Sequence, residues 1–356
     1  MYIHNFSAGP CILPKSVMEK AAESVVNYNN TGLSIIEMSH RSKDFVAVMD
    51  KAVSLVKELM DIPDNYDVIF LQGGASTQFY MTALNLLPLD GKGAYINTGT
   101  WADKAIKEAK LLGNIDVIAS SKDKNFNYIP KNISIPNDAS YLHYTTNNTI
   151  FGTQFKSIPE TNIPVVADMS SDILSKPVDV SKFDLIYAGV QKNIGPSGAT
   201  LVIVKKGILG KTGRTLTSMM DYQVHIDKES MFNTPPCFSI YVSMLTMEWL
   251  KELGGVKAIE KINTEKAELL YAEIDRNSLF VGAANVEDRS LMNPTFKMLD
   301  ESLTEKFLQQ ATESGISGIK GHRSVGGFRA SMYNALPLSS VAALVEVMKD
   351  FEKSNS

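Results

Sequence analysis

The chain has 356 residues, of which 44% are hydrophobic and 21% charged, and its formal net charge is -4. This length exceeds what one hydrophobic core usually serves, so we expect two domains in an ordinary soluble globular protein. The negative charge argues against a nucleic-acid partner, and the absence of a long apolar run argues against a membrane span or secretion, which leaves the cytoplasm. Cys11 and Cys237 lie far apart outside any C-x-x-C pattern, so we expect neither a disulfide framework nor a metal site.

The N-terminal region is expected to form a loop and then two helices. Glycine and proline residues break the first 15 positions, and Ser16 is the expected N-cap of a helix that ends at Val26. A polar segment with His40 and Arg41 precedes a second helix, predicted over residues 46–60. Adjacent histidine and arginine side chains suit an anion, but they are equally common in a polar loop.

A strand, a glycine pair and a helix follow one another between residues 67 and 87. Asp67 to Leu71 is strand-like, GGASTQ occupies Gly73 to Gln78, and a helix is predicted from Phe79 to Leu87. This order directs backbone N–H groups and a helix dipole at an anion. Since many strand–helix turns carry glycine, a phosphate site and a plain turn remain equally open.

The next strands also end in polar or aromatic side chains. Residues 94–97 read as a strand, and Trp101 then precedes a helix predicted over residues 102–112. At a strand end a tryptophan can stack on a flat ring, or it can pack in a core or an interface. A strand at residues 141–144 leads to Thr149, whose hydroxyl lies at a strand end, although the preceding Asn-Asn pair is also a turn signal.

Asp168 and Lys192 follow two successive buried strands. Residues 163–167 form one apolar run that ends in Asp168, and residues 185–188 form the next, with Lys192 just beyond it. A lysine beside apolar strand ends can have a lowered pKa and act as a nucleophile, although a lone loop lysine is usually solvated. An aspartate in this place is more often a helix cap. Together the two favour pyridoxal phosphate, because the lysine forms the Schiff base and the carboxylate keeps the pyridine nitrogen protonated.

The alternation of strands and helices from about residue 65 to about residue 205 predicts an α/β domain with a mainly parallel sheet. Ligands bind such sheets at the carboxyl ends of the strands. Five features fall at these ends, namely the GGAS segment, Trp101, Thr149, Asp168 and Lys192. We expect a large cofactor domain at residues 16–254 and a smaller α+β domain at residues 255–356, against which residues 1–15 pack.

The C-terminal region changes pattern. A long helix is expected to begin at the segment Asn233 to Pro236 and to end at Leu253, before two glycines. The remaining elements are predicted as a helix (264–275), a strand (295–298), a helix (303–314), a strand (329–333) and a last helix with a one-sided apolar stripe. The run GHRSVGGFRAS carries His322, Arg323 and Arg329, which read either as an exposed basic turn or as an anion site.

Eight blocks of the sequence carry a likeness to a known family: NFSAGP, EMSHRSKDF, GGASTQF, DMSSDILS, IYAGVQKNIGPSG, MFNTPP, KAELLY and GHRSVGGFRASMYN. Over essentially its whole length the chain resembles the phosphoserine aminotransferases, which are fold-type I pyridoxal 5'-phosphate enzymes of the class V aminotransferase group. The resemblance implies a seven-stranded, mainly parallel sheet flanked by helices, and a homodimer with shared active sites. It also implies amino transfer from L-glutamate to 3-phosphohydroxypyruvate, giving O-phospho-L-serine and 2-oxoglutarate in serine biosynthesis. A phosphorylated hydroxythreonine substrate of pyridoxine biosynthesis stays open.

The resemblance also implies roles for individual residues. Lys192 would bind the cofactor aldehyde and Asp168 its ring nitrogen. The remaining cofactor contacts would be a phosphate cup from the Ala75 and Ser76 backbone and Gln191, stacking by Trp101, a hydroxyl contact from Thr149, and Asn233 and Thr234 from the second subunit. The substrate would be held by Arg329 at its α-carboxylate and by His40, Arg41, His322 and Arg323 around its distal charge.

Two positions depart from the family pattern, and three other functions stay open. Some members carry an arginine in place of Ser76 and a serine in place of Ala8; because the cup works through backbone N–H groups, Ser76 should still allow cofactor binding. Contacts near Ala8 are undetermined. The other functions are a cysteine desulfurase, a serine–glyoxylate type transaminase, and a catalytically silent cofactor-binding sensor. Neither Cys11 nor Cys237 has a cationic neighbour in the sequence, which argues against the desulfurase.

Overall fold

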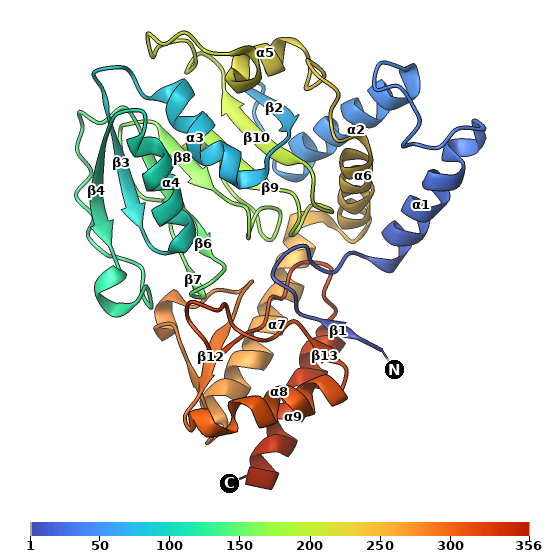
Figure 1. The fold of residues 1–356 in the computed structure, drawn as a ribbon, viewed down its shortest axis with the longest axis vertical. Coiled ribbons are helices and arrows are strands. Elements are labelled where there is room, and N and C mark those ends of the chain that lie inside the picture. The colour runs from blue at the N-terminus through green and yellow to red at the C-terminus, as the bar shows by residue number, and fades with distance from the viewer. Residues whose placement is uncertain (1, 356) are drawn as a thin grey trace.

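The computed structural model describes residues 2–355, which form a large α/β part and a smaller part built mainly from the C-terminal third (Figure 1). A seven-stranded sheet with the order β2-β10-β9-β8-β5-β3-β4 lies at the centre of the large part. Its strands are β2 (Tyr66–Leu71), β3 (Lys92–Asn97), β4 (Asn114–Ser120), β5 (Leu142–Thr145), β8 (Val165–Asp168), β9 (Leu185–Gly189) and β10 (Thr200–Lys205). Only β10 runs antiparallel to its neighbours, so the other six strands end at the same edge. The predicted mainly parallel sheet is confirmed.

Helices cover both faces of this sheet (Figure 1). One face carries α3 (Gly74–Leu86), α4 (Thr100–Lys110) and α5 (Tyr222–Asp227), and the other carries α1 (Lys15–Val26), α2 (Lys43–Leu59) and α6 (Cys237–Glu252). Along β10, Leu201 and Ile203 enter one core while Val202 and Val204 enter the other. Burial on both faces explains why the strands read as continuous apolar runs rather than as alternating ones.

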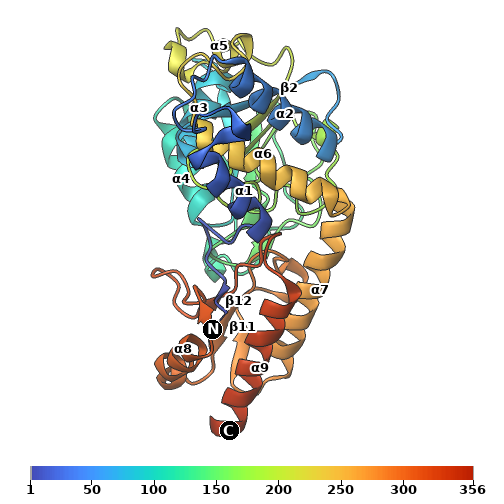
Figure 2. The same ribbon diagram turned by 90° about the vertical axis from the view of Figure 1, so that its right-hand side faces the viewer.

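The smaller part has its own core, which the N-terminal segment joins. It contains α7 (Gly255–Arg276), α8 (Thr304–Glu313), α9 (Leu338–Asn355) and a sheet of β11 (Phe280–Gly282), β12 (Thr295–Met298) and β14 (Phe328–Arg329). Figure 2 shows α7 running from the large part down into the smaller one. Near the N-terminus, β1 (His4–Asn5) pairs with β13 (Ile316–Ser317), and Phe6 packs in the same core as Phe280. The domain limits 16–254 and 255–356 stay a prediction.

A short hairpin and several 3-10 turns complete the fold. The hairpin β6 (Asn147–Asn148) and β7 (Thr153–Gln154) follows β5, and 3-10 turns occur at Tyr28–Asn30, Lys122–Lys124, Val180–Lys182, Ser218–Met220, Val286–Asp288 and Glu301–Leu303. Within residues 2–355, no helix has both the length and the apolar character needed to cross a bilayer.

Several predicted element limits are wrong. Ser16 is not an N-cap, because α1 begins one residue earlier and follows Pro14 without a side-chain cap. The helix expected from Thr264 begins at Gly255 instead, after Gly254, whose φ of 106° is suited to glycine. The strand expected over residues 329–333 ends at Arg329. Its partner β12 is preceded by Pro294, which accepts a hydrogen bond from Ala330 but has no N–H to continue the ladder.

Candidate active site

Lys192 lies buried on the loop that follows β9. Its side chain donates a hydrogen bond from Nζ to Thr149 Oγ1 at 2.8 Å, and the residue is only 8% exposed. Burial lowers the pKa of the ammonium to about 8, while Asp168 opposes this shift and Arg329 adds to it. A lower pKa leaves more neutral amine near pH 7, and the neutral amine is the nucleophilic form.

Asp168 ends β8, the strand next to β9, and is 4% exposed. Its Oδ1 accepts hydrogen bonds from the backbone N (2.9 Å) and the hydroxyl (2.6 Å) of Ser170. Burial raises the pKa of this carboxyl, whereas Ser170 and the charge of Lys192 oppose the rise. In residues 2–355 the hydrogen bonds to the carboxylate reach Oδ1 alone. Oδ2 can therefore accept a hydrogen bond from a protonated ring nitrogen.

The N-terminus of α3 lies at the same sheet edge, directly after β2. The helix begins at Gly74 rather than at Phe79, so Ala75 and Ser76 stand in its first turn, where backbone N–H groups have no intrahelical partner. Gly73 precedes it with φ 90°, and a Cβ there would lie 2.0 Å from Thr77 Oγ1. The first turn thus requires a glycine and offers N–H groups to an anion such as a phosphate.

Two further predicted cofactor residues lie on neighbouring loops. Trp101 is in the first turn of α4, just after β3, and within residues 2–355 its buried indole Nε1 has no hydrogen-bond partner. Gln191 precedes Lys192 and folds back over Gly189, where an added Cβ would lie 2.5 Å from Gln191 Oε1. Both positions suit contact with a flat, phosphorylated ring.

A group of cations surrounds His322 in the loop before β14. The pKa of His322 is lowered first by burial and then by the charges of Arg329, Arg323 and Lys104. None of these four side chains belongs to an ion pair within residues 2–355, and the buried Arg329 Nε has no hydrogen-bond partner there. Cations without a counter-charge favour a ligand with more than one negative group.

Lys104 was not predicted from the sequence. Its Nζ lies 4.5 Å from the centre of the Trp101 ring, a cation–π distance. The spacing of three residues from Trp101 on a helix is the only sequence signal for it, because residues three apart share a helix face. Its proximity to His322 depends on the packing of the smaller part against the large one.

The N-terminal segment 8–11 also lies against Lys192, which the sequence did not reveal beyond the NFSAGP block. Tyr333 donates a hydrogen bond to the Ala8 carbonyl at 2.9 Å, and the Cys11 thiol donates to the Lys192 carbonyl at 2.9 Å. A Cβ on Gly9 would lie 3.4 Å from Lys192 Cγ. Burial raises the pKa of Cys11 to about 12, so the thiol is protonated at neutral pH and is a poor nucleophile.

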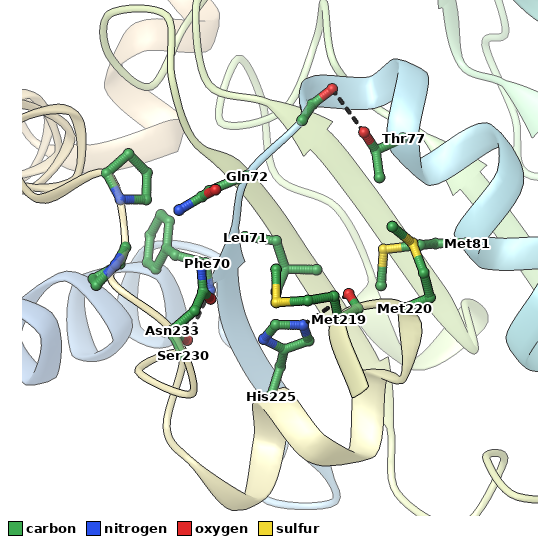
Figure 3. A pocket seen from close by; sticks show the side chains of 13 residues that line it. Phe70, Leu71, Gln72, Thr77, Met81, Met219, Met220, His225, Ser230 and Asn233 are labelled. Atoms are coloured by element: carbon green, nitrogen blue, oxygen red, sulfur yellow. Dashed lines mark hydrogen bonds between the residues drawn. The ribbon is translucent and has the colours of Figure 1, made fainter. Parts of the chain in front are cut away.

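The remaining predicted residues are Asn233, Thr234, His40 and Arg41. Asn233 lines a pocket of about 260 Å³ together with Gln72, His225 and the Gly73 that precedes α3 (Figure 3), and Gln72 Nε2 donates to the carbonyl of Thr234 at 2.6 Å. His40 and Arg41, between α1 and α2, hydrogen-bond to each other, with 3.4 Å between Arg41 Nε and His40 Nε2. No hydrogen bond or ion pair among residues 2–355 links these residues to Lys192 or Arg329.

Comparisons with known proteins agree with this geometry. The family model Aminotransferase class-V matches residues 3–344. The phosphoserine aminotransferase of Flavobacterium psychrophilum is 63% identical over 350 residues, which is 98% of each chain. Among solved structures, the phosphoserine aminotransferase from Bacillus circulans subsp. alkalophilus superposes with a TM-score of 0.97 at 44% identity over 99% of both chains. The pyridoxal-phosphate-bound enzyme from Trichomonas vaginalis gives 0.93 at 36% identity over 98% of this chain and 99% of its own. The chain therefore belongs to the class V aminotransferase family and, within it, to the phosphoserine aminotransferases.

Proposed function

We propose that this protein transfers the amino group of L-glutamate to 3-phosphohydroxypyruvate with pyridoxal 5'-phosphate as cofactor, giving O-phospho-L-serine and 2-oxoglutarate for serine biosynthesis. The observation that carries the proposal is the buried pair of Lys192 and Asp168 beside a group of cations that has no protein counter-charge. The pair suits the cofactor, and the cations suit two doubly acidic substrates.

The residues of this chain fit the cofactor. When bound, pyridoxal phosphate supplies an aldehyde that exchanges amines and a ring that withdraws electrons from the substrate Cα. Lys192 would hold the aldehyde and Asp168, through its free oxygen, the ring nitrogen. The other contacts would be the N–H groups of Ala75 and Ser76 with Gln191 for the phosphate, the Trp101 ring for stacking, and the Thr149 hydroxyl.

The protein's part in the chemistry is the movement and placement of protons. With the cofactor and glutamate bound, Lys192 would be the base, with a lowered pKa, that takes up and returns the Cα proton of the substrate. Asp168 would keep the ring nitrogen of the bound cofactor protonated. The second half of the reaction uses the same groups in reverse on the keto acid.

Arg329 and the neighbouring residues would bind opposite ends of the substrate. Arg329 is part of β14 and pairs with Thr295 of β12, a rigid setting for a two-pronged grip on the α-carboxylate. Lys104, His322 and Arg323, which we call the distal residues, lie on a helix surface and a glycine-flanked loop. They can adapt to a distal group that is a carboxylate in glutamate and a phosphate in the keto acid.

A homodimer with shared sites would give a role to the remaining predicted residues. We propose that Asn233 and Thr234 contact the cofactor phosphate of the partner's site, and that His40 and Arg41 approach the distal group of the partner's substrate. Within residues 2–355 they make no hydrogen bond or ion pair to Lys192, which is consistent with this arrangement. We also propose a cytoplasmic location and a second, phosphorylated hydroxythreonine substrate for pyridoxine biosynthesis, whose phosphate and carboxylate present the same two charges.

Single-turnover amino transfer tests the proposal. L-glutamate should convert the bound cofactor to its amino form, and 3-phosphohydroxypyruvate should convert it back. Keto acids without a phosphate should react more slowly in the second step. A cofactor-binding sensor would bind glutamate without conversion. Equal rates with phosphorylated and unphosphorylated keto acids would contradict the assigned substrate.

A further inference from the structure

Lys266 is a buried cation outside the site described so far. It lies on α7 with 0% exposure, and its Nζ donates hydrogen bonds to the carbonyls of Met332 (3.1 Å), Tyr333 (2.9 Å) and Leu336 (3.2 Å). An ammonium has three N–H donors, so these three carbonyls satisfy all of them. Burial lowers the pKa of Lys266 to about 7, and no carboxylate among residues 2–355 counters this shift.

The three carbonyls belong to the segment 332–336, which begins three residues after Arg329. Within that segment, the hydroxyl of Tyr333 donates to the Ala8 carbonyl and lies close to both Arg329 and Thr149. The next residue, Asn334, donates its backbone N–H to Asn193 Oδ1 at 3.0 Å, and Asn193 is the neighbour of Lys192. The segment 332–336 therefore contacts the Lys192 loop on one side and α7 on the other.

A buried ammonium without a counter-charge is an unfavourable choice for stability alone, since an apolar side chain of similar volume often serves a core as well or better. The lysine is suited to a different task, because one side chain fixes three backbone carbonyls that no regular strand pairing holds. We propose that Lys266 is a positioning residue, which fixes the segment 332–336 and, through Tyr333, directs Arg329 at the α-carboxylate of both substrates. This inference rests on the proposed function, which assigns that carboxylate to Arg329.

The test is a double-mutant cycle on the holoenzyme with L-glutamate and 3-phosphohydroxypyruvate. Lys266→Met leaves the three carbonyls without a donor, and we expect KM for both substrates to rise about tenfold while kcat and the absorbance of the bound cofactor stay near the wild type. In an Arg329→Lys background the same change should raise KM less than about twofold, because there is no bidentate grip left to misalign. Lys261→Met, an exposed lysine on the same helix, is the matched control and should change neither constant.

Two results would overturn the inference: an unchanged KM in Lys266→Met, or the same fold-change in both backgrounds, which would mean a general effect on the fold. If Arg329→Lys alone left KM for both acids unchanged, the role of Arg329 in the proposed function would fail instead. Should Lys266→Met not fold, Lys266→Gln keeps an amide donor for part of the contact. It should give a smaller rise in KM and faster amide exchange in residues 330–336 than in the wild type, and wild-type values for both would also overturn the inference.

Discussion

Lys192 and Asp168 each reduce the penalty that burial places on the other. The carboxylate raises the pKa of the lysine while desolvation lowers it, and the ammonium acts on the carboxyl in the opposite sense. The two groups therefore stabilise each other's charged form. When Lys192 loses its charge, the pKa of Asp168 is no longer lowered by it. The two Ser170 donors support the Asp168 charge whether or not Lys192 is charged.

Replacing Asp168 by asparagine should separate cofactor binding from chemistry. Asp168→Asn removes the charge that would hold the ring nitrogen protonated, so we expect the single-turnover rate with glutamate to fall at least about a hundredfold while the cofactor stays bound. Absorbance changes of the cofactor give both quantities. Asp172→Asn is the control, because this buried carboxylate bonds to Thr146 and Gln154, and its loss should reduce stability more than the rate. A wild-type rate in Asp168→Asn would mean that another acid serves the ring.

His322 should make the binding of a dianion depend on pH. Burial and the charges of Arg329, Arg323 and Lys104 lower its pKa in the free enzyme, and a bound dianion offsets those charges and raises it. The complex then holds more protons than the free enzyme, so affinity is highest below the free-state pKa and falls as the pH rises through the bound-state pKa. Titration with glutarate, whose carboxyls stay ionised above about pH 6, avoids a change in ligand charge. In His322→Gln the affinity for glutarate should depend less on pH. An unchanged dependence of affinity on pH in that variant would exclude His322 as its cause.

At the scale of elements, the start of α3 depends on a single backbone angle. Gly73→Ala places a Cβ in the left-handed region and 2.0 Å from Thr77 Oγ1, so the first turn must shift and its N–H groups lose their alignment. A hydrogen bond to a charged group contributes about 1.5–3 kcal/mol, so the loss of one such N–H contact to the phosphate should lower cofactor affinity about tenfold or more. Cofactor titration of the unloaded protein measures this.

Gly207→Ala is the matched control for that change. Gly207 has φ 81°, close to that of Gly73, but an added Cβ there would have no atom within 4 Å. Both variants should lose stability through the backbone angle, whereas only Gly73→Ala should lose cofactor affinity. Equal cofactor affinities in the two variants would contradict the proposal that the first turn of α3 binds the cofactor phosphate.

The same element shows what the sequence could and could not predict. The predicted limits of β9 lie within one residue of the observed ones, because this strand is a continuous apolar run with a polar residue before it and a glycine at its end. The start of α3 was missed, since GGAST has no apolar periodicity and its cap is a glycine rather than a side chain. The error at residues 330–333 has a non-local cause, because the strand β14 ends opposite Pro294, which directly precedes β12.

At the scale of the whole molecule, the site joins segments that are distant in the sequence. Residues 8–11, Thr149, Asp168, Lys192 and Arg329 come together between the large and the smaller part. The strand-end residues were predictable, because parallel strands place their carboxyl ends at one edge. The contacts of Tyr333, Lys104 and Lys266 depend on how the two parts pack, and no local pattern in the sequence encodes that packing.

The proposed dimer can be tested by subunit complementation. Two inactive or impaired chains, Lys192→Ala and Arg41→Ala, are co-expressed with different tags, and the hybrid dimer is isolated. If Arg41 acts on the partner's site, one site of the hybrid combines an intact Lys192 from one chain with an intact Arg41 from the other, and the second site lacks both. The hybrid should then reach about half the wild-type rate with 3-phosphohydroxypyruvate, because one of the two symmetry-related sites is complete. If both residues acted within one chain, every site would lack one of them, and the hybrid would not exceed half the rate of the Arg41→Ala dimer.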